Sequence, residues 1–191
     1  MGDVGPAATG ANTDVIGTSV DSGSGASGIA NVKVSLQKGI GLCLNLAKTA
    51  FDQSCPTVHI LTTSGNWTLT VADSVLTDAT TYNITSFATD VAGNAQSPAT
   101  SGSFDWDQSA PNPGFVINAG NPAFATATGV TLILTDSFGV SKYRKANGSD
   151  CSAATWTTYA GGNIPHTLAS GDGAKTVCFE VRDVALNVGA S

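Results

Sequence analysis

Residues 81–94 read TYNITSFATDVAGN, and residues 174–187 read AKTVCFEVRDVALN. Each stretch alternates apolar and polar side chains, as a half-buried β-strand does, and then ends in the phrase Asp-Val-Ala-x-Asn. The phrase begins at Asp90 in the first copy and at Asp183 in the second. A repeat at this separation indicates a duplicated domain rather than a duplicated active site.

The repeated phrase has the chemistry of a turn. A short Asp side chain accepts backbone N–H bonds after a strand, and Gly93 can take a positive φ without strain. Leu186 stands at the matching position of the second copy, so the second turn is expected to differ. Calcium binding by Asp90 and Asp183 is the alternative, and the absence of a contiguous DxDxDG loop favours the turn.

The remaining sequence also indicates strands rather than helices. Only 12% of residues are charged, and Ser, Thr, Gly and Asn occupy most polar positions. Six stretches are predicted as strands, and turn-forming clusters separate them. Two of the six lie within the repeats quoted above. The stretches are 32–37, 67–72, 81–90, 129–136, 140–145 and 175–183. The fold class is therefore all-β, with two tandem antiparallel β-sandwiches.

The prolines of SAPNP at 109–113 predict a stiff linker between the two domains. The first domain is expected over residues 1–108, with an insertion around the loop between Cys43 and Cys55. The second is expected over residues 109–191. The segment SFDW predicts a closing strand for the first domain, whereas only VGAS follows Asn187, so the closing strand of the second domain is expected to be truncated.

Four longer stretches resemble tandem bacterial Ig-like domains of large surface adhesins and fibre proteins. They are GTSVDSGSG (17–25), FATDVAGN (87–94), INAGNPAFATATGVTLILTD (117–136) and GDGAKTVCFEVRDVALN (171–187). The resemblance implies Ig-like sandwiches in an extracellular or cell-surface segment that mediates attachment to a cell-surface protein or a glycan. It also implies flanking domains in a longer chain and allows a homo-oligomer. An accessory module that positions a catalytic domain of a secreted carbohydrate-active enzyme is the alternative.

Charge and composition exclude several classes of function. The net charge of −6 argues against nucleic acid and anionic membranes as partners. No apolar run is long enough for membrane insertion as a helix. The sequence has no GxSxG, HExxH or P-loop motif, and His59 and His166 are expected on strand or loop surfaces away from a nucleophile. We therefore expect a non-enzyme.

The four cysteines form an even set without a CxxC spacing, which argues against zinc. Pairing neighbours in sequence gives Cys43 with Cys55 and Cys151 with Cys178, one bridge in each domain. The other two connectivities remain open from the sequence. Disulfides of this kind are typical of an oxidising, extracellular compartment.

No cofactor is expected apart from structural calcium. Asp105 and Asp107 are the best metal candidates, because alternate residues of a strand project to one side. Asp90 or Asn94 would complete the set near the boundary between the domains. A polar strand end before a proline is the alternative, and it is favoured.

Aromatic residues supply the candidates for ligand binding. Trp67 and Trp156 occupy matching places in the two halves and are predicted in the cores, whereas Trp106 is expected to be partly exposed and able to stack on a sugar ring. The insertion at 37–61 contributes Phe51 and His59 as ligand-binding candidates. Its apolar residues either pack beneath the loop or contact a ligand: Ile40, Leu42, Leu44, Leu46 and Phe51.

Overall fold

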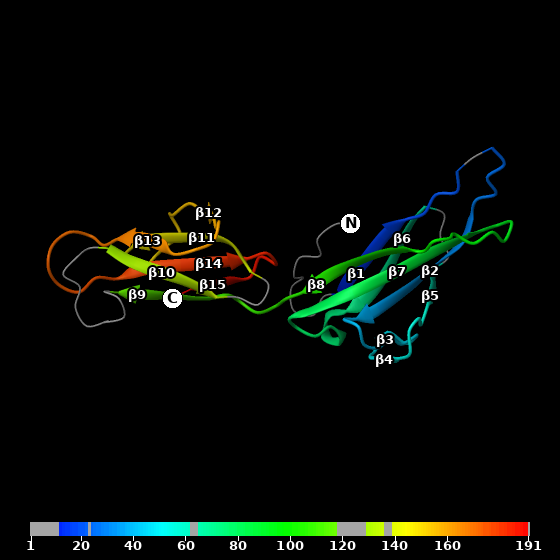
Figure 1. Cartoon of the computed structure of the whole chain (residues 1–191), viewed down its shortest axis with the longest axis horizontal. Coiled ribbons are helices and arrows are strands. Elements are labelled where there is room, and N and C mark those ends of the chain that lie inside the picture. Colours follow the sequence, from blue (N-terminus) through cyan, green and yellow to red (C-terminus); the bar gives the residue numbers. More distant parts are fainter. Residues whose placement is uncertain (1–11, 23, 62–64, 118–128, 136–138, 191) are drawn as a thin grey trace. The chain divides into compact units, whose positions relative to one another are not determined.

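The computed structural model describes residues 12–22, 24–61, 65–117, 129–135 and 139–190. Within these residues the chain forms fifteen β-strands and one short 3-10 helix, so the predicted all-β class is confirmed. The chain divides into two compact units, with the boundary between Asp107 and Gln108 (Figure 1). Among the described residues, no helix has the length and apolar composition needed to cross a bilayer.

The first unit contains eight strands and the 3-10 helix: β1 (Asn12–Thr18), β2 (Ile29–Lys38), β3 (Cys43–Leu44), β4 (Phe51–Gln53), β5 (His59–Leu61), β6 (Asn66–Ala72), η1 (Asp73–Val75), β7 (Thr80–Asp90) and β8 (Thr100–Trp106). Strands β1 and β6 form a two-stranded sheet. The second sheet has the order β4-β3-β2-β7-β8, and β5 also pairs with β2. All of these pairings are antiparallel.

The two sheets of the first unit share one apolar core. Strands β1 and β6 present Val15 and Leu69 to it, and β2 and β7 present Leu36 and Tyr82 from the opposite sheet. Successive side chains of β6 alternate between exposed and buried, as expected for a strand with one face on a core. The unit is therefore a β-sandwich whose core follows the predicted alternation.

The second unit contains β9 (Asn112–Ile117), β10 (Gly129–Thr135), β11 (Val140–Asn147), β12 (Thr157–Thr158), β13 (Ile164–Thr167), β14 (Val177–Asp183) and β15 (Val188–Ala190). One sheet has the order β13-β10-β9 and the other has the order β12-β11-β14-β15. Leu132 and Ile164 from the first of these sheets pack with Phe179 and Val181 from the second. A second sandwich results.

All six strands predicted from alternation are present, and so is the closing strand β8. One expectation about the second unit is wrong. Residues 112–113 are not linker, because β9 begins at Asn112 and Pro113 pairs with Leu134. Strand β9 is an edge strand of its sheet, where a missing N–H donor is tolerated.

The closing strand of the second unit is not missing. Residues Val188–Ala190 form β15, which pairs antiparallel with β14 from Glu180 to Arg182. Strand β15 has three residues, whereas β8 has seven, and it pairs with β14 only at Glu180–Arg182, so the closing strand of the second unit is present and short. Gly23, residues 118–128 and Asp136 belong to the stretches quoted for the resemblance and lie outside the described residues.

The repeated phrase forms the same turn in both units. The Oδ1 atom of Asp90 accepts the backbone N–H of Asn94 at 2.7 Å, and its Oδ2 atom accepts the side-chain amide at 2.8 Å. Asp183 makes the same two bonds with Asn187, at 2.8 and 2.9 Å. The side-chain bond from Asn94 is the main reason that the pKa of Asp90 lies below its ordinary value. The turn interpretation is confirmed for Asp90 and Asn94.

The two turns differ in backbone strain rather than in hydrogen bonding. Gly93 has a φ of 91°, and Leu186 adopts the left-handed region with a φ of 76°. That region is unfavourable for a residue with a Cβ atom by about 1–2 kcal/mol. The second turn is thus formed by a residue that the backbone disfavours, so the two turns share the Asp–Asn hydrogen bonds and differ in strain.

Replacing Leu186 with glycine should stabilise the second unit by about 0.5–1 kcal/mol. Glycine removes the strain, and the larger conformational freedom of the unfolded chain offsets part of that gain. Little apolar burial is lost, because Leu186 is 59% exposed. The matched change Gly93→Leu should destabilise the first unit by a similar amount. Denaturant unfolding of both variants measures this, and shifts of the same sign would contradict the prediction.

Candidate functional site

The insertion in the first unit forms a small subdomain that a disulfide closes. Strands β3 and β4 pair with each other, and β3 continues the large sheet beyond β2. Cys43 in β3 is bonded to Cys55, and Cys151 is bonded to Cys178 in the second unit. The pairing of neighbouring cysteines is confirmed, with no free cysteine among the residues that the structure describes. Two disulfides indicate an oxidising environment.

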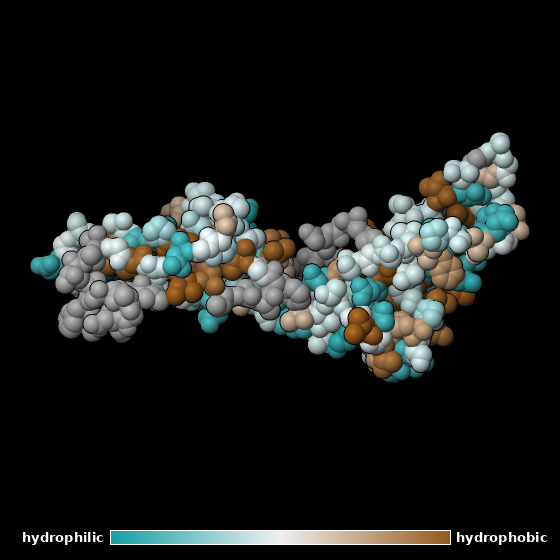
Figure 2. Space-filling view, viewed as in Figure 1, coloured by the Kyte–Doolittle hydropathy of each residue, from teal (hydrophilic) through white to brown (hydrophobic). Residues whose placement is uncertain are grey.

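The apolar residues of the insertion divide into two groups. Leu44 is fully buried, and the ring of Phe51 lies 5.1 Å from the ring of Tyr82 between centroids. In contrast, Ile40 is 100% exposed, Leu46 is 69% exposed, and Leu42 is also exposed. Apolar atoms are visible over β3 and β4 in Figure 2. Phe51 therefore packs beneath the loop, and Ile40, Leu42 and Leu46 form the exposed apolar surface of the insertion.

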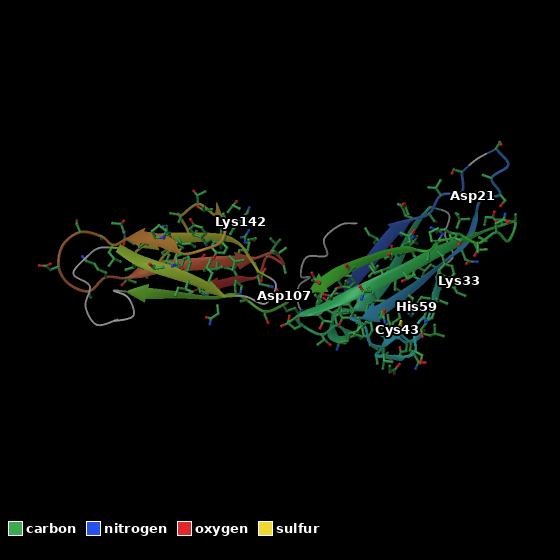
Figure 3. All side chains as sticks on the ribbon, in the orientation of Figure 1. Asp21, Lys33, Cys43, His59, Asp107 and Lys142 are labelled. Atoms are coloured by element: carbon green, nitrogen blue, oxygen red, sulfur yellow. A yellow bond between two sulfur atoms is a disulfide. The ribbon has the colours of Figure 1, made fainter. Side chains whose placement is uncertain are left out.

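His59 is buried rather than on the surface, so that expectation is wrong. Its side chain is 5% exposed on β5, on the same side of the first unit as Cys43 (Figure 3). Burial lowers the pKa of His59, the nearby charge of Lys48 lowers it further, and a hydrogen bond with the backbone of Leu44 opposes both effects. His59 is therefore neutral at pH 7 and unavailable to a large ligand.

The lowered pKa of His59 predicts a loss of stability in acid. The unfolded chain binds a proton below about pH 6.5, whereas folded His59 resists protonation until a lower pH. Stability from this group is therefore present above pH 6.5 and is lost as the pH falls through the folded pKa. The slope cannot exceed about 1.4 kcal/mol per pH unit for one proton.

The variant His59→Gln should show a shallower decrease of the free energy of unfolding of the first unit between pH 7.5 and 5. Denaturant unfolding at several pH values measures it. His166→Gln is the matched control, because burial also lowers the pKa of His166, which belongs to the second unit. Parallel curves for His59→Gln and the unchanged protein would show that His59 is not the linked group.

The four residues proposed to hold calcium cannot bind one ion. Asp105 lies opposite Thr81 near the start of β7, whereas Asp90 ends the same strand. A strand advances about 3.3 Å per residue, so roughly 30 Å separate the two carboxylates. Asn94 lies with Asp90, to which it is hydrogen-bonded. This grouping is wrong because the antiparallel register places its members at opposite ends of the sheet.

Asp105 and Asp107 also do not project to one side. Asp105 is exposed on β8 and accepts a 2.5 Å hydrogen bond from the Thr81 hydroxyl, whereas Asp107 is 3% exposed and follows the end of the strand. Among the described residues, the one cluster with suitable metal-ligand atoms is Cys151, Cys178 and Glu180. Its two sulfur atoms are bonded to each other, so they are not thiolate ligands.

The predictions for two of the tryptophans, Trp106 and Trp156, are wrong. Trp106 is 1% exposed in the core of the first unit, so the expectation that it is partly exposed and stacks on a sugar is wrong. Its place in β8 puts it on the inner face beside Phe104 by alternation. Trp67 is buried in the core as predicted.

Trp156 lies outside the core, contrary to its prediction. Its ring centroid is 4.8 Å from Cζ of Arg144 and 4.4 Å from Cζ of Arg182, distances typical of cation–π contacts. Arg144 also forms a 2.5 Å ion pair with Glu180. We call Arg144, Trp156 and Arg182 the Arg–Trp cluster.

Sequence reasoning missed the Arg–Trp cluster, although one signal was present. In VCFEVRD, the apolar Phe179 and Val181 alternate with Glu180 and Arg182, which places Arg182 on the outer face. These two arginines are the only ones in the chain. The register between β11 and β14 brings them near each other, and sequence alone does not supply that register.

No protein-family model matches this chain, and no curated protein sequence matches it.

Proposed function

We propose that this protein is a non-catalytic, extracellular structural and adhesive segment, formed by Ig-like modules of a bacterial surface adhesin or fibre. In this role the two sandwiches act as rigid spacers, and the insertion contacts a protein or glycan on a target cell. The observation that carries the proposal is the disulfide-closed insertion with its exposed apolar surface on an otherwise regular sandwich.

Two physical arguments support the contact role of the insertion. Isolated exposed apolar residues are common, but Ile40, Leu42 and Leu46 are gathered in one short segment. The Cys43–Cys55 bond and the pairing of β3 with β4 restrain the chain at and after Cys43, where Leu46 lies, and Ile40 and Leu42 directly precede it. A preorganised loop loses less conformational entropy when it binds a partner.

The proposal is tested by attachment of the purified, fluorescently labelled chain to a glycan array and to a panel of cells. We expect saturable binding to at least one glycan or cell type. The triple variant Ile40→Ser, Leu42→Ser and Leu46→Ser should weaken that binding at least tenfold, because it removes the exposed apolar surface while leaving the disulfide and the buried Leu44 in place.

The matched control replaces three exposed apolar residues of the two turns: Val91→Ser, Val184→Ser and Leu186→Ser. This control should bind as the unchanged protein does. Equal losses in both triple variants would show that binding depends on general surface hydrophobicity. Absence of saturable binding to every glycan and cell would overturn the adhesive role.

A further inference from the structure

A groove of about 780 Å³ lies open in the first unit. Its lining comes from the end of β1 and the residues that follow it, from Trp67 on β6, and from β2, β7 and the start of β8. The groove thus lies where the small β1-β6 sheet and the large sheet separate at one edge of the sandwich.

The groove exists because side chains on the inner face are small there. On β7 the inner positions change from the buried Tyr82 and Ile84 to Ser86 and Ala88. Gly102 on β8, which pairs with Ile84, also lines the groove without a side chain. Trp67 forms part of the lining and lies so close to β1 that a Cβ atom at Gly17 would be 2.2 Å from its ring. The groove is therefore the space that Ser86, Ala88 and Gly102 leave unfilled beside Trp67 and Ile84.

The second unit shows what occupies the equivalent place. Its β10-β13 pair and its β11-β14-β15 sheet repeat the β1-β6 pair and the β2-β7-β8 sheet of the first unit. Strand β9 pairs antiparallel with the outer edge of β10 and also contacts β14 and β15. In the second unit, therefore, one extra strand closes the seam between the two sheets.

In the first unit, the counterparts of those three strands are β1, β7 and β8, and all three line the groove. Strand β1 pairs with β6 along one edge, and within residues 12–22, 24–61 and 65–117 no strand pairs with its other edge. Its outward N–H and C=O groups can therefore accept a further strand. The groove and the free edge together have the form of a site for a strand like β9.

The charge of the groove restricts its occupant. Asp21 and Asp90 are in its lining, and no Lys or Arg is among the lining residues. A second copy of this chain carries the same net charge of −6, which opposes self-association. Residues 1–11 contain no Lys or Arg. These observations favour a basic segment of another protein.

We propose that the first unit binds an extended peptide segment of another protein by strand addition to β1. The added strand runs antiparallel to β1, as β9 does to β10, and inserts alternate apolar side chains into the groove. Because β1 runs towards Asp21, the N-terminal end of the bound segment lies beside that carboxylate, and a Lys or Arg at that end pairs with it. This site is separate from the exposed surface of the insertion and does not depend on the adhesive function.

The test uses the whole chain and the synthetic peptide KTVTVTVT. Titration followed by amide NMR should saturate, and hydrogen exchange should slow at the N–H groups of residues 12–18 that face away from β6. The peptide KTPTVTPT, which cannot form a complete ladder, should bind at least tenfold more weakly. The peptide ETVTVTVT should also bind more weakly, since it replaces the basic residue with an acidic one.

Variants of β7 test the groove itself. Ser86→Phe should weaken peptide binding at least tenfold by filling the hollow, whereas Thr85→Phe on the exposed face of the same strand should leave it unchanged. Ala88→Leu fills the same hollow with a smaller group and serves if Ser86→Phe does not fold.

Three results would overturn the proposal. The first is absence of saturable binding, or equal loss from Ser86→Phe and Thr85→Phe. The second is slowed exchange on β4 or β8 instead of β1. The third is protection, before peptide is added, of those N–H groups of residues 12–18 that face away from β6. Such protection in a dimer, or in a monomer that loses it when residues 1–11 are removed, would show that the groove has another occupant. These results do not depend on whether the chain attaches to cells, so the peptide-binding proposal and the adhesive function are tested separately.

Discussion

Replacing Trp106 with alanine should lower the free energy of unfolding of the first unit by about 3–5 kcal/mol. The indole is 1% exposed and belongs to the core cluster that includes Leu36, Leu44 and Tyr82. Its loss removes a large buried apolar surface and leaves a cavity that a strand end cannot easily close. Denaturant unfolding followed by amide NMR, which separates the two units, measures the effect.

Trp156→Ala is the matched control for this prediction. Trp156 lies outside both core clusters and contacts Arg144 and Arg182, and exposed contacts of this kind contribute about 0.5–1 kcal/mol each. We expect a loss of about 1–2 kcal/mol, confined to the second unit. A loss from Trp156→Ala as large as that from Trp106→Ala would contradict the assignment of the two side chains.

Removing the disulfide of the second unit should have an effect of similar size. The double variant Cys151→Ala and Cys178→Ala should lower the free energy of unfolding of that unit by about 3.5 kcal/mol, because the bond closes a loop with a sequence separation of 27. The cross-link reduces the conformational entropy of the unfolded chain, and longer loops gain more. Calorimetry of the unchanged and the variant chain measures the shift.

The Cys43–Cys55 bond provides an internal comparison. It spans a separation of 12, so the variant Cys43→Ala and Cys55→Ala should destabilise the first unit by about 3 kcal/mol. Each double variant removes the disulfide of one unit only, so the free energy of unfolding of the other unit should not change. A decrease in both units from either variant would show that the units do not unfold independently.

The strands were predictable because alternation is a local property. Each of β2, β6, β7 and β14 combines β-branched or aromatic residues with period-2 polarity, and that combination is unfavourable in a helix. The repeated turn was predictable for the same reason, since Asp90 bonds to Asn94 four residues later. Neighbouring cysteines likewise pair within their own units. Interactions that are local in sequence can be recognised in sequence.

The predicted burial of Trp106 and Trp156 was wrong because alternation within a short strand does not show which face of the strand packs on the core. Where no strand forms, alternation gives no information at all. Trp106 ends β8 on the inner face, whereas Trp156 precedes the two-residue β12 and meets its arginines only through the pairing of β11 with β14. The calcium set failed for a related reason. Antiparallel pairing of β7 and β8 separates Asp90 from Asp105, although they are near in sequence.

The sequence by itself determined the all-β class, the position of the main strands and the two turns, because each depends on residues within one strand or turn. It favoured the pairing of neighbouring cysteines, and the structure decided that pairing. Only the tertiary structure decided that Trp106 is buried and that Trp156 lies outside the core. It also decided that Val188–Ala190 pairs with β14 and that a groove lies beside β1. The groove depends on small residues of β7 and β8 meeting across from β1. Register and sheet packing bring these residues together, and neither is contained in any single stretch of the chain.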